Sequence, residues 1–151
     1  MQRDERLAIL QGLPKVDLHR HLEGSMRLST LLDLGRSRGL DLPLKDEESL
    51  AKVVCYNEGE PRSLAHFLTK FRSGWYSGYA DVERVCREVV EDAFADGVRV
   101  LELRFSPEHF SRGTRLDVAG VMQAVCETGQ AAAEDLGMAL GFLLTLVRER
   151  R

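Results

Sequence analysis

The sequence has few of the features that assign a protein to a membrane, secreted or disulfide-bonded class. No apolar run approaches the roughly 20 residues of a transmembrane helix. The first six residues are mostly charged, so they lack the apolar core of a secretory signal. Cysteine occurs only at Cys55, Cys86 and Cys126, an odd number without motif spacing. We therefore expect buried free thiols and a cytoplasmic protein with no membrane partner.

An excess of charge of one sign is also lacking. The net charge is -3 and the lysines and arginines are scattered, so we expect no nucleic-acid partner. With 44% hydrophobic and 30% charged residues, the composition is that of an ordinary soluble protein. The sequence contains no internal repeat and no interdomain linker, which predicts a single domain over residues 1–151.

Segments with helical and strand periodicity alternate along the chain. Apolar residues recur every three or four positions in six segments, three of which follow a capping residue: Ser63, Asp81 or Asp117. The predicted helices cover residues 4–11, 28–38, 47–54, 64–75, 82–94 and 118–136. The predicted strands cover residues 16–21, 98–105 and 138–147. Apolar strands that alternate with helices predict a parallel α/β sheet.

The first strand carries the clearest functional signal. Val16 and Leu18 alternate with Asp17, His19 and His21, so both histidines lie on one face of the strand. Two imidazoles at a strand end can bind one metal ion, and zinc is commonly bound by neutral imidazole. The alternative for the bare His-x-His is a chance meeting of two polar residues at a strand end.

The same alternation predicts a charged cluster inside the sheet. On the second strand, Glu102 and Arg104 lie opposite the apolar face, and Asp17 lies on the corresponding side of the first strand. We expect these three charges to pair beneath the histidines, because removing one partner of a buried ion pair costs about 3–5 kcal/mol. We interpret the cluster as structural rather than catalytic.

The remaining histidines are weaker candidates as metal ligands. His66 lies off the apolar face of its predicted helix and is expected at the surface. His109 follows the second strand in a predicted loop, where we expect it to be solvated. The segment from His21 to Glu23 also matches the His-x-Glu of cytidine-deaminase-type zinc sites. Such a site needs a Cys-x-x-Cys, which the sequence lacks, so that class is excluded.

The string Val-Asp-Leu-His-Arg-His-Leu-Glu-Gly-Ser at residues 16–25 resembles the first metal-binding strand of the adenosine deaminase family. This family consists of metal-dependent amidohydrolases built on a (β/α)8 barrel. The segment Glu-Leu-Arg-Phe-Ser-Pro at residues 102–107 is similar to the second strand of the family. The resemblance implies a partial TIM-type barrel of three parallel strands, a Zn2+ cofactor, and hydrolytic deamination of a purine nucleoside or base.

The resemblance also implies roles for individual residues. His19 and His21 match the first two zinc ligands, and His21 would also contact the substrate. Glu23 matches a substrate-binding position that is aspartate in adenosine enzymes and glutamate in relatives that act on adenine or other adenine-bearing nucleosides. Phe67 and Phe71 are similar to aromatic residues of the family's lid helix over the purine. The alternative for these two rings is core packing of an amphipathic helix.

The length of the chain departs from the family. A (β/α)8 barrel takes roughly 250 residues, whereas this chain has 151. The family's third histidine ligand, its His-Ala-Gly-Glu segment with the proton-donating glutamate, its second catalytic histidine and its late aspartate pair have no counterpart here. We therefore expect an N-terminal barrel portion that ends after the third strand, contains no catalytic residue and is inactive alone. The alternative is a non-catalytic partial barrel that self-associates or binds a partner through its open sheet edge.

Overall fold

The computed structural model describes residues 3–146 of the chain. Three strands form one parallel sheet in the order β1 (Lys15–His21), β2 (Val98–Phe105) and β3 (Ala139–Leu144). The predicted parallel α/β sheet is therefore confirmed. The third strand ends at Leu144, and Val147, its predicted last residue, lies outside the described residues.

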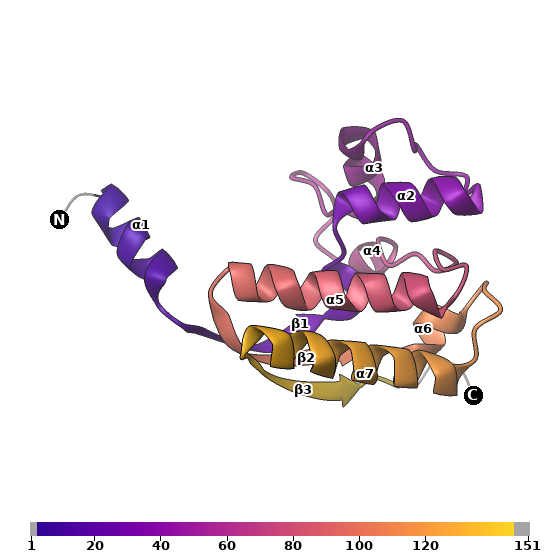
Figure 1. Ribbon diagram of the computed structural model, residues 1–151. Helices are drawn as coiled ribbons and strands as arrows, with labels where there is room; N and C mark the ends of the chain where they lie inside the picture. Colours follow the sequence, from indigo (N-terminus) through magenta and orange to yellow (C-terminus); the bar gives the residue numbers. More distant parts are fainter. Residues whose placement is uncertain (1–2, 147–151) are drawn as a thin grey trace.

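Two amphipathic helices cover one face of the sheet. Helices α5 (Tyr79–Ala95) and α7 (Val118–Leu136) each lead into the next strand, and they pack side by side (Figure 1). The carboxylate of Asp117 accepts a hydrogen bond from the backbone N–H of Gly120 at 2.8 Å and so caps α7. The left-handed conformation of Gly137 ends the same helix. The predicted start and end of α7 are both confirmed.

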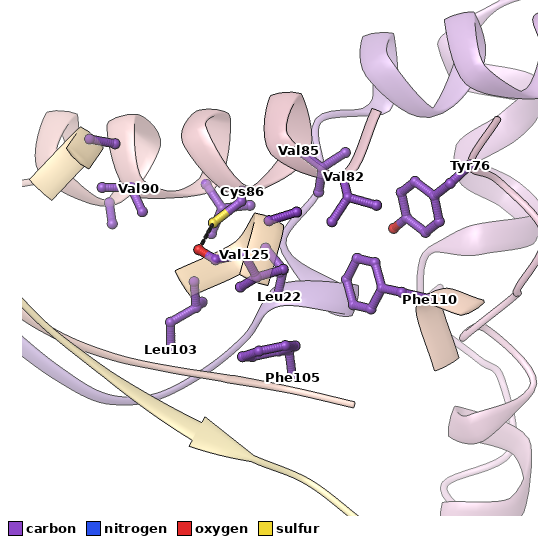
Figure 2. Packing of buried hydrophobic residues seen from close by; sticks show 14 of the residues in the cluster. Leu22, Tyr76, Val82, Val85, Cys86, Val90, Leu103, Phe105, Phe110 and Val125 are labelled. Atoms are coloured by element: carbon purple, nitrogen blue, oxygen red, sulfur yellow. Dashed lines mark hydrogen bonds between the residues drawn. The ribbon is translucent and has the colours of Figure 1, made fainter. Parts of the chain in front are cut away.

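Strand β2 supplies the centre of the hydrophobic core. Leu101, Leu103 and Phe105 alternate along one face of the strand and are fully buried. Figure 2 shows Leu103 and Phe105 near Cys86 of α5 and Val125 of α7. The thiol of Cys86 donates a hydrogen bond to the carbonyl of Val125 at 3.4 Å, which joins the two helices above the strand.

The other elements lie around the ends of the sheet. The long link from β1 to β2 contains, before α5, η1 (Leu22–Gly24), α2 (Leu28–Arg38), α3 (Glu47–Val54) and α4 (Leu64–Leu68). Helix α6 (Pro107–Ser111) follows β2, while α1 (Arg3–Gly12) precedes β1 and extends away from the sheet (Figure 1). Among the helices of residues 3–146, none combines the length and the hydropathy needed to cross a membrane.

The helix predicted over residues 64–75 is much shorter in the structure. Ser63 caps it as predicted, with its hydroxyl accepting a hydrogen bond from the backbone N–H of His66, but the helix ends at Leu68. Trp75 lies beyond it and is buried, with its Nε1 donating to the carbonyl of Arg72 at 2.8 Å. Trp75 therefore joins the core through a tertiary contact, and its helical spacing from Leu68 is a coincidence.

The start of α5 also differs from the prediction. Gly78 is the N-cap, so Asp81 lies within the first turn and does not precede the helix. The carboxylate of Asp81 instead accepts a hydrogen bond from the backbone N–H of Ser77 at 2.6 Å. The acidic residue still binds an amide at the helix start, but the helix begins earlier than the apolar periodicity indicated.

The cysteines are all free thiols, and their burial differs. Cys86 is buried and Cys126 is partly buried, as expected for apolar helix faces. Cys55 is exposed, so the expectation of buried thiols is wrong at this position. The reason is local, because Cys55 follows the last turn of α3, a helix in which only Leu50 is buried.

The outer edge of β1 exposes apolar side chains. Val16 is 62% exposed and Leu18 is 56% exposed. Within residues 3–146, β1 pairs only with β2, and β3 forms the other edge of the sheet. Self-association through such an edge remains a prediction.

We predict that Leu103→Ala lowers the free energy of unfolding by about 2–5 kcal/mol, because it leaves a cavity beneath α5 and α7. The matched control is Leu10→Ala in α1, where the leucine is 57% exposed and the change should stay within about 0.5 kcal/mol. Urea denaturation of the two variants measures both values. Equal losses would show that β2 is not the centre of the core.

Candidate active site

The carboxyl ends of β1 and β2 lie side by side. His21, the last residue of β1, pairs in register with Arg104 of β2. The pairing of β1 is irregular between Asp17 and Arg20, yet the rings of His19 and His21 remain neighbours, with centroids 5.3 Å apart. The structure thus brings together the two histidines that the sequence singled out, at the end of the sheet where active sites of parallel barrels form.

His21 is held in the protonation state that binds metal. Partial burial lowers the pKa of His21, and the nearby charges of His19 and Arg104 lower it further. A neutral imidazole has a free ring nitrogen for a metal ion or a ligand hydrogen bond. At neutral pH, His21 therefore offers an acceptor without first losing a proton.

Glu23 lies in η1 and connects the first strand to the second. Its Oε1 accepts a hydrogen bond from the backbone N–H of Ser106 at 2.5 Å, just beyond the end of β2. The other carboxylate oxygen and the hydroxyl of Ser106 are buried, and neither has a partner among the described residues. Burial raises the pKa of Glu23, and the hydrogen bond from Ser106 opposes this shift. Two unpaired polar atoms therefore lie together at the strand ends.

A cavity of about 480 Å³ opens at this end of the sheet. His21 and Glu23 line one part of it, and Phe67 and Phe71 line another. The two phenylalanine rings meet edge to face with centroids 5.1 Å apart, and Phe67 is 44% exposed, so it is not a core residue. The structure thus places all four predicted substrate-binding residues around one cavity, whereas His19 is not part of its lining.

The other two histidines are partly buried, and each has a ring nitrogen within hydrogen-bond distance of an oxygen atom. The side chain of His66 is 29% exposed, and its Nε2 lies 3.0 Å from a carboxylate oxygen of Glu60. His109 lies in α6, not in a loop; its Nε2 is 3.1 Å from the carbonyl oxygen of Arg72, and the residue lines the large cavity. The loop predicted at His109 is therefore wrong, whereas the partly exposed ring of His66 agrees with its predicted surface position.

The charges on the inner face of the sheet do not pair as predicted. Asp17 binds Arg20, with 2.8 Å between the carboxylate and Nε, and is not ion-paired with Arg104. Burial of Asp17 opposes the effect of this contact, but the hydrogen bonds from Arg20 and His19 lower the pKa of Asp17 overall. Arg104 donates instead to the carbonyl of Leu18 at 3.3 Å. The two residues that pair, Asp17 and Arg20, flank the irregularity in the pairing of β1 with β2.

Comparison with known proteins identifies the family. The family model for adenosine deaminase matches residues 14–151. The chain belongs to the adenosine deaminase family. A probable adenosine deaminase of Dictyostelium discoideum is 46% identical over 132 residues, which are 85% of this chain and 16% of that protein. The adenosine deaminase of Aliivibrio fischeri is 42% identical over 133 residues, 86% of this chain and 39% of the relative.

Solved structures show the same fold. An amidohydrolase from Burkholderia ambifaria with bound Zn is 26% identical, with a TM-score of 0.80 over 99% of this chain and 40% of that one. An adenine deaminase from Arthrobacter aurescens is 26% identical, with a TM-score of 0.65 over 87% and 38% of the two chains. The N6-methyl-AMP deaminase of Arabidopsis thaliana is 29% identical, with a TM-score of 0.62 over 91% and 41%.

The comparisons confirm the predicted fold class, a partial (β/α)8 barrel beginning with three parallel strands. The chain spans about 39% of the Aliivibrio adenosine deaminase and 16% of the Dictyostelium protein.

The geometry of the histidine pair fits part of a zinc site. Two imidazoles on one tetrahedral zinc have ring centroids about 5 Å apart, and the rings of His19 and His21 are 5.3 Å apart. Residues 3–146 contain no group of three His, Cys, Asp or Glu side chains placed to hold a metal ion. The described chain thus supplies two donors, while a catalytic zinc usually takes three from the protein.

Sequence reasoning missed several residues of the cavity wall. Ser106 and Arg112 line it after β2, and Thr145 lines it after β3. Their position directly beyond the strands was a usable signal, because the C-terminal ends of parallel strands form the functional face. Lys70 was also missed; it lines a smaller adjoining cavity with Glu23 and Phe71, and no periodicity pointed to it.

We predict that the pKa of His21 in the metal-free chain lies below the ordinary histidine value, and that His19→Ala raises it by removing a neighbouring positive charge. Titration of the imidazole protons by NMR in the presence of a chelator measures both values. Because the folded-state pKa is lowered, the unfolded state binds the proton first, so stability falls as the pH drops from the ordinary value through the lowered one. An ordinary pKa that His19→Ala leaves unmoved would contradict the deduced environment.

Proposed function

We propose that this chain forms the first metal-binding strand and one wall of the substrate cavity in a zinc-dependent enzyme that hydrolytically deaminates adenosine or a related adenine compound. One observation carries the proposal: in a chain of this family, His21, Glu23, Phe67 and Phe71 all line one cavity at the ends of parallel strands. The active enzyme requires further residues that complete the barrel and the metal site.

The residues divide the work by their chemistry. His19 and His21 would hold the zinc ion from one side of the site. When bound, zinc lowers the pKa of a coordinated water and so makes hydroxide available as the nucleophile. Phe67 and Phe71 offer aromatic faces to a planar purine. Glu23 offers the carboxylate oxygen that Ser106 leaves unpaired, which can accept a hydrogen bond from a ligand hydroxyl or amine.

The substrate class follows from Glu23 and has three members: adenosine, adenine and a modified adenine nucleoside. Glutamate is one methylene longer than aspartate, so its carboxylate reaches further into the cavity from the same backbone position. Purine salvage by a cytoplasmic enzyme is consistent with these substrates. The relatives are named for adenosine, adenine and N6-methyl-AMP, which is the same range of chemistry.

A second candidate function rests on the exposed edge of the sheet. Val16 and Leu18 expose apolar surface beside the unpaired edge of β1, and such edges form assembly contacts. A non-catalytic module that binds a second copy through this edge would be dimeric and would need no metal. Analytical ultracentrifugation of the chain separates the two functions, because the enzymatic proposal does not require a stable dimer.

The isolated chain should bind zinc weakly and should release no ammonia from adenosine, because residues 3–146 place no third donor beside the two imidazoles. Calorimetric titration of the chain with zinc measures the affinity. His19→Ala and His21→Ala should each reduce the affinity further, whereas His66→Ala, which alters a histidine paired with Glu60, should not. Tight stoichiometric zinc binding that survives both substitutions would refute the assignment of the metal strand.

Glu23→Asp tests selectivity in an active protein that contains this chain. We expect the ratio of kcat/KM for adenosine to kcat/KM for adenine to change at least about tenfold, because the carboxylate is withdrawn from the ligand and from Ser106. The control is Glu58→Gln, an exposed carboxylate outside the cavity lining. An unchanged ratio in Glu23→Asp would remove Glu23 from substrate recognition while leaving the metal strand untouched.

A further inference from the structure

Helix α4 carries Phe67 to the cavity without an apolar anchor of its own. None of its five residues is buried. Leu64 is 72% exposed, Leu68 is 52% exposed and Phe67 is 44% exposed. The hydrophobic effect, which normally fixes a surface helix through one buried stripe, therefore contributes little to the position of α4.

A cluster of polar contacts replaces that anchor. The carboxylate of Glu60, in the turn before α4, accepts hydrogen bonds from Lys70 Nζ at 2.7 Å and from Asn57 Nδ2 at 3.0 Å. His66 Nε2, from within α4, lies 3.0 Å from its second oxygen. One side chain thus joins the segment before the helix, the helix itself and the segment after it.

The cluster persists at neutral pH. The hydrogen bonds from Lys70 and Asn57, with a smaller contribution from His66, hold the pKa of Glu60 at about 2. The carboxylate is consequently ionised under all physiological conditions, and charge-assisted bonds of this kind are stronger than neutral ones. The hydroxyl of Tyr56 also donates to the backbone carbonyl of Glu60 at 2.9 Å, which fixes the turn that carries the carboxylate.

Lys70 connects this cluster to the cavity wall. Its side chain is only 10% exposed, and it lines a cavity of about 250 Å³ together with Glu23, Phe67 and Phe71. The ammonium group bound by Glu60 thus belongs to a residue that shares this cavity with both aromatic rings and with Glu23. A substitution of Glu60 should therefore change the position of both rings.

We propose that Glu60 is a positioning residue that holds α4, and with it Phe67 and Phe71, over the cavity. Glu60 itself is not part of the lining of the large cavity. Its effect on a ligand passes through Lys70 and the helix. The claim that the cavity binds a substrate rests on the proposed function. The attachment of α4 by Glu60 does not.

Trypsin tests the attachment directly in the 151-residue chain. While Glu60 binds Lys70, the lysine is buried and poorly accessible for cleavage. Glu60→Gln keeps the size of the side chain and removes the charge, so cleavage after Lys70 should become about tenfold faster. Glu58→Gln, an exposed neighbour, is the matched control and should leave this rate unchanged.

Mass spectrometry of the products identifies the cleaved bond. Unchanged cleavage after Lys70 in Glu60→Gln would overturn the proposal. Equal acceleration after Arg87, in α5, would also overturn it, because that pattern means global destabilisation rather than release of α4. Glu60→Ala, which deletes the carboxylate, should accelerate cleavage after Lys70 at least as much as Glu60→Gln.

Kinetics in an active protein that contains this chain test the positioning role. Glu60→Gln should raise KM for adenosine about tenfold with a smaller change in kcat, because it loosens a binding wall that does not perform chemistry. An unchanged KM would overturn the positioning role. If the wild-type protein does not deaminate adenine compounds, the proposed function fails, while the trypsin result still decides the attachment of α4.

Discussion

The burial of one face of β2 beneath α5 and α7 is the contact on which the rest of the structure depends. Leu101, Leu103 and Phe105 are fully buried there. Their packing fixes the position of β2 without any contribution from the candidate site. β1 does not have such support, because its own Val16 and Leu18 are exposed. It is placed by pairing with β2 and by Leu22, which enters the core directly after it (Figure 2). The positions of His19 and His21 therefore depend on the position of β2.

The cavity consequently has two walls of different construction. One wall, with His21, Glu23 and Ser106, stands on paired strand ends and is joined by the hydrogen bond from Ser106 to Glu23. The other wall, with Phe67 and Phe71, is attached by polar side chains around a short exposed helix. A metal centre requires fixed donors, whereas a surface that admits a ligand benefits from being easier to displace. The two constructions match these two requirements.

Most of the fold could be predicted from the sequence, because the spacing of apolar residues in a long amphipathic segment indicates which face is buried. The helices over residues 28–38, 47–54 and 118–136 agree with α2, α3 and α7, since caps and glycine stops such as Gly39 and Gly137 mark their ends. The end of α4 could not be predicted in this way, because Trp75 matches the helical spacing but is buried by the tertiary fold. Alternation also failed within β1, where an irregular pairing gives Asp17 a partner in Arg20.

The candidate site shows the same division between local and tertiary information. His19 and His21 are two residues apart, and their rings lie together although the pairing of β1 is irregular just before them. The cluster around Glu60 joins Asn57, His66 and Lys70 across a turn and a helix whose C-terminal end the sequence does not define. Ser106 reaches Glu23 only after two distant strands pair. Contacts between residues far apart in the sequence form only in the folded chain, and no local sequence pattern predicts them.

The order of the strands also has a consequence for how the protein folds. β2 and β3 are joined by little more than α6 and α7, whereas β1 and β2 are separated by the long link that contains η1, α2, α3, α4 and α5. Closing a longer loop costs more chain entropy, so the pairing of β2 with β3 is favoured to form first. The strand with the histidines is then added to a sheet that already exists. His19 and His21, although early in the sequence, would reach their folded positions late, after the strand that positions them is in place.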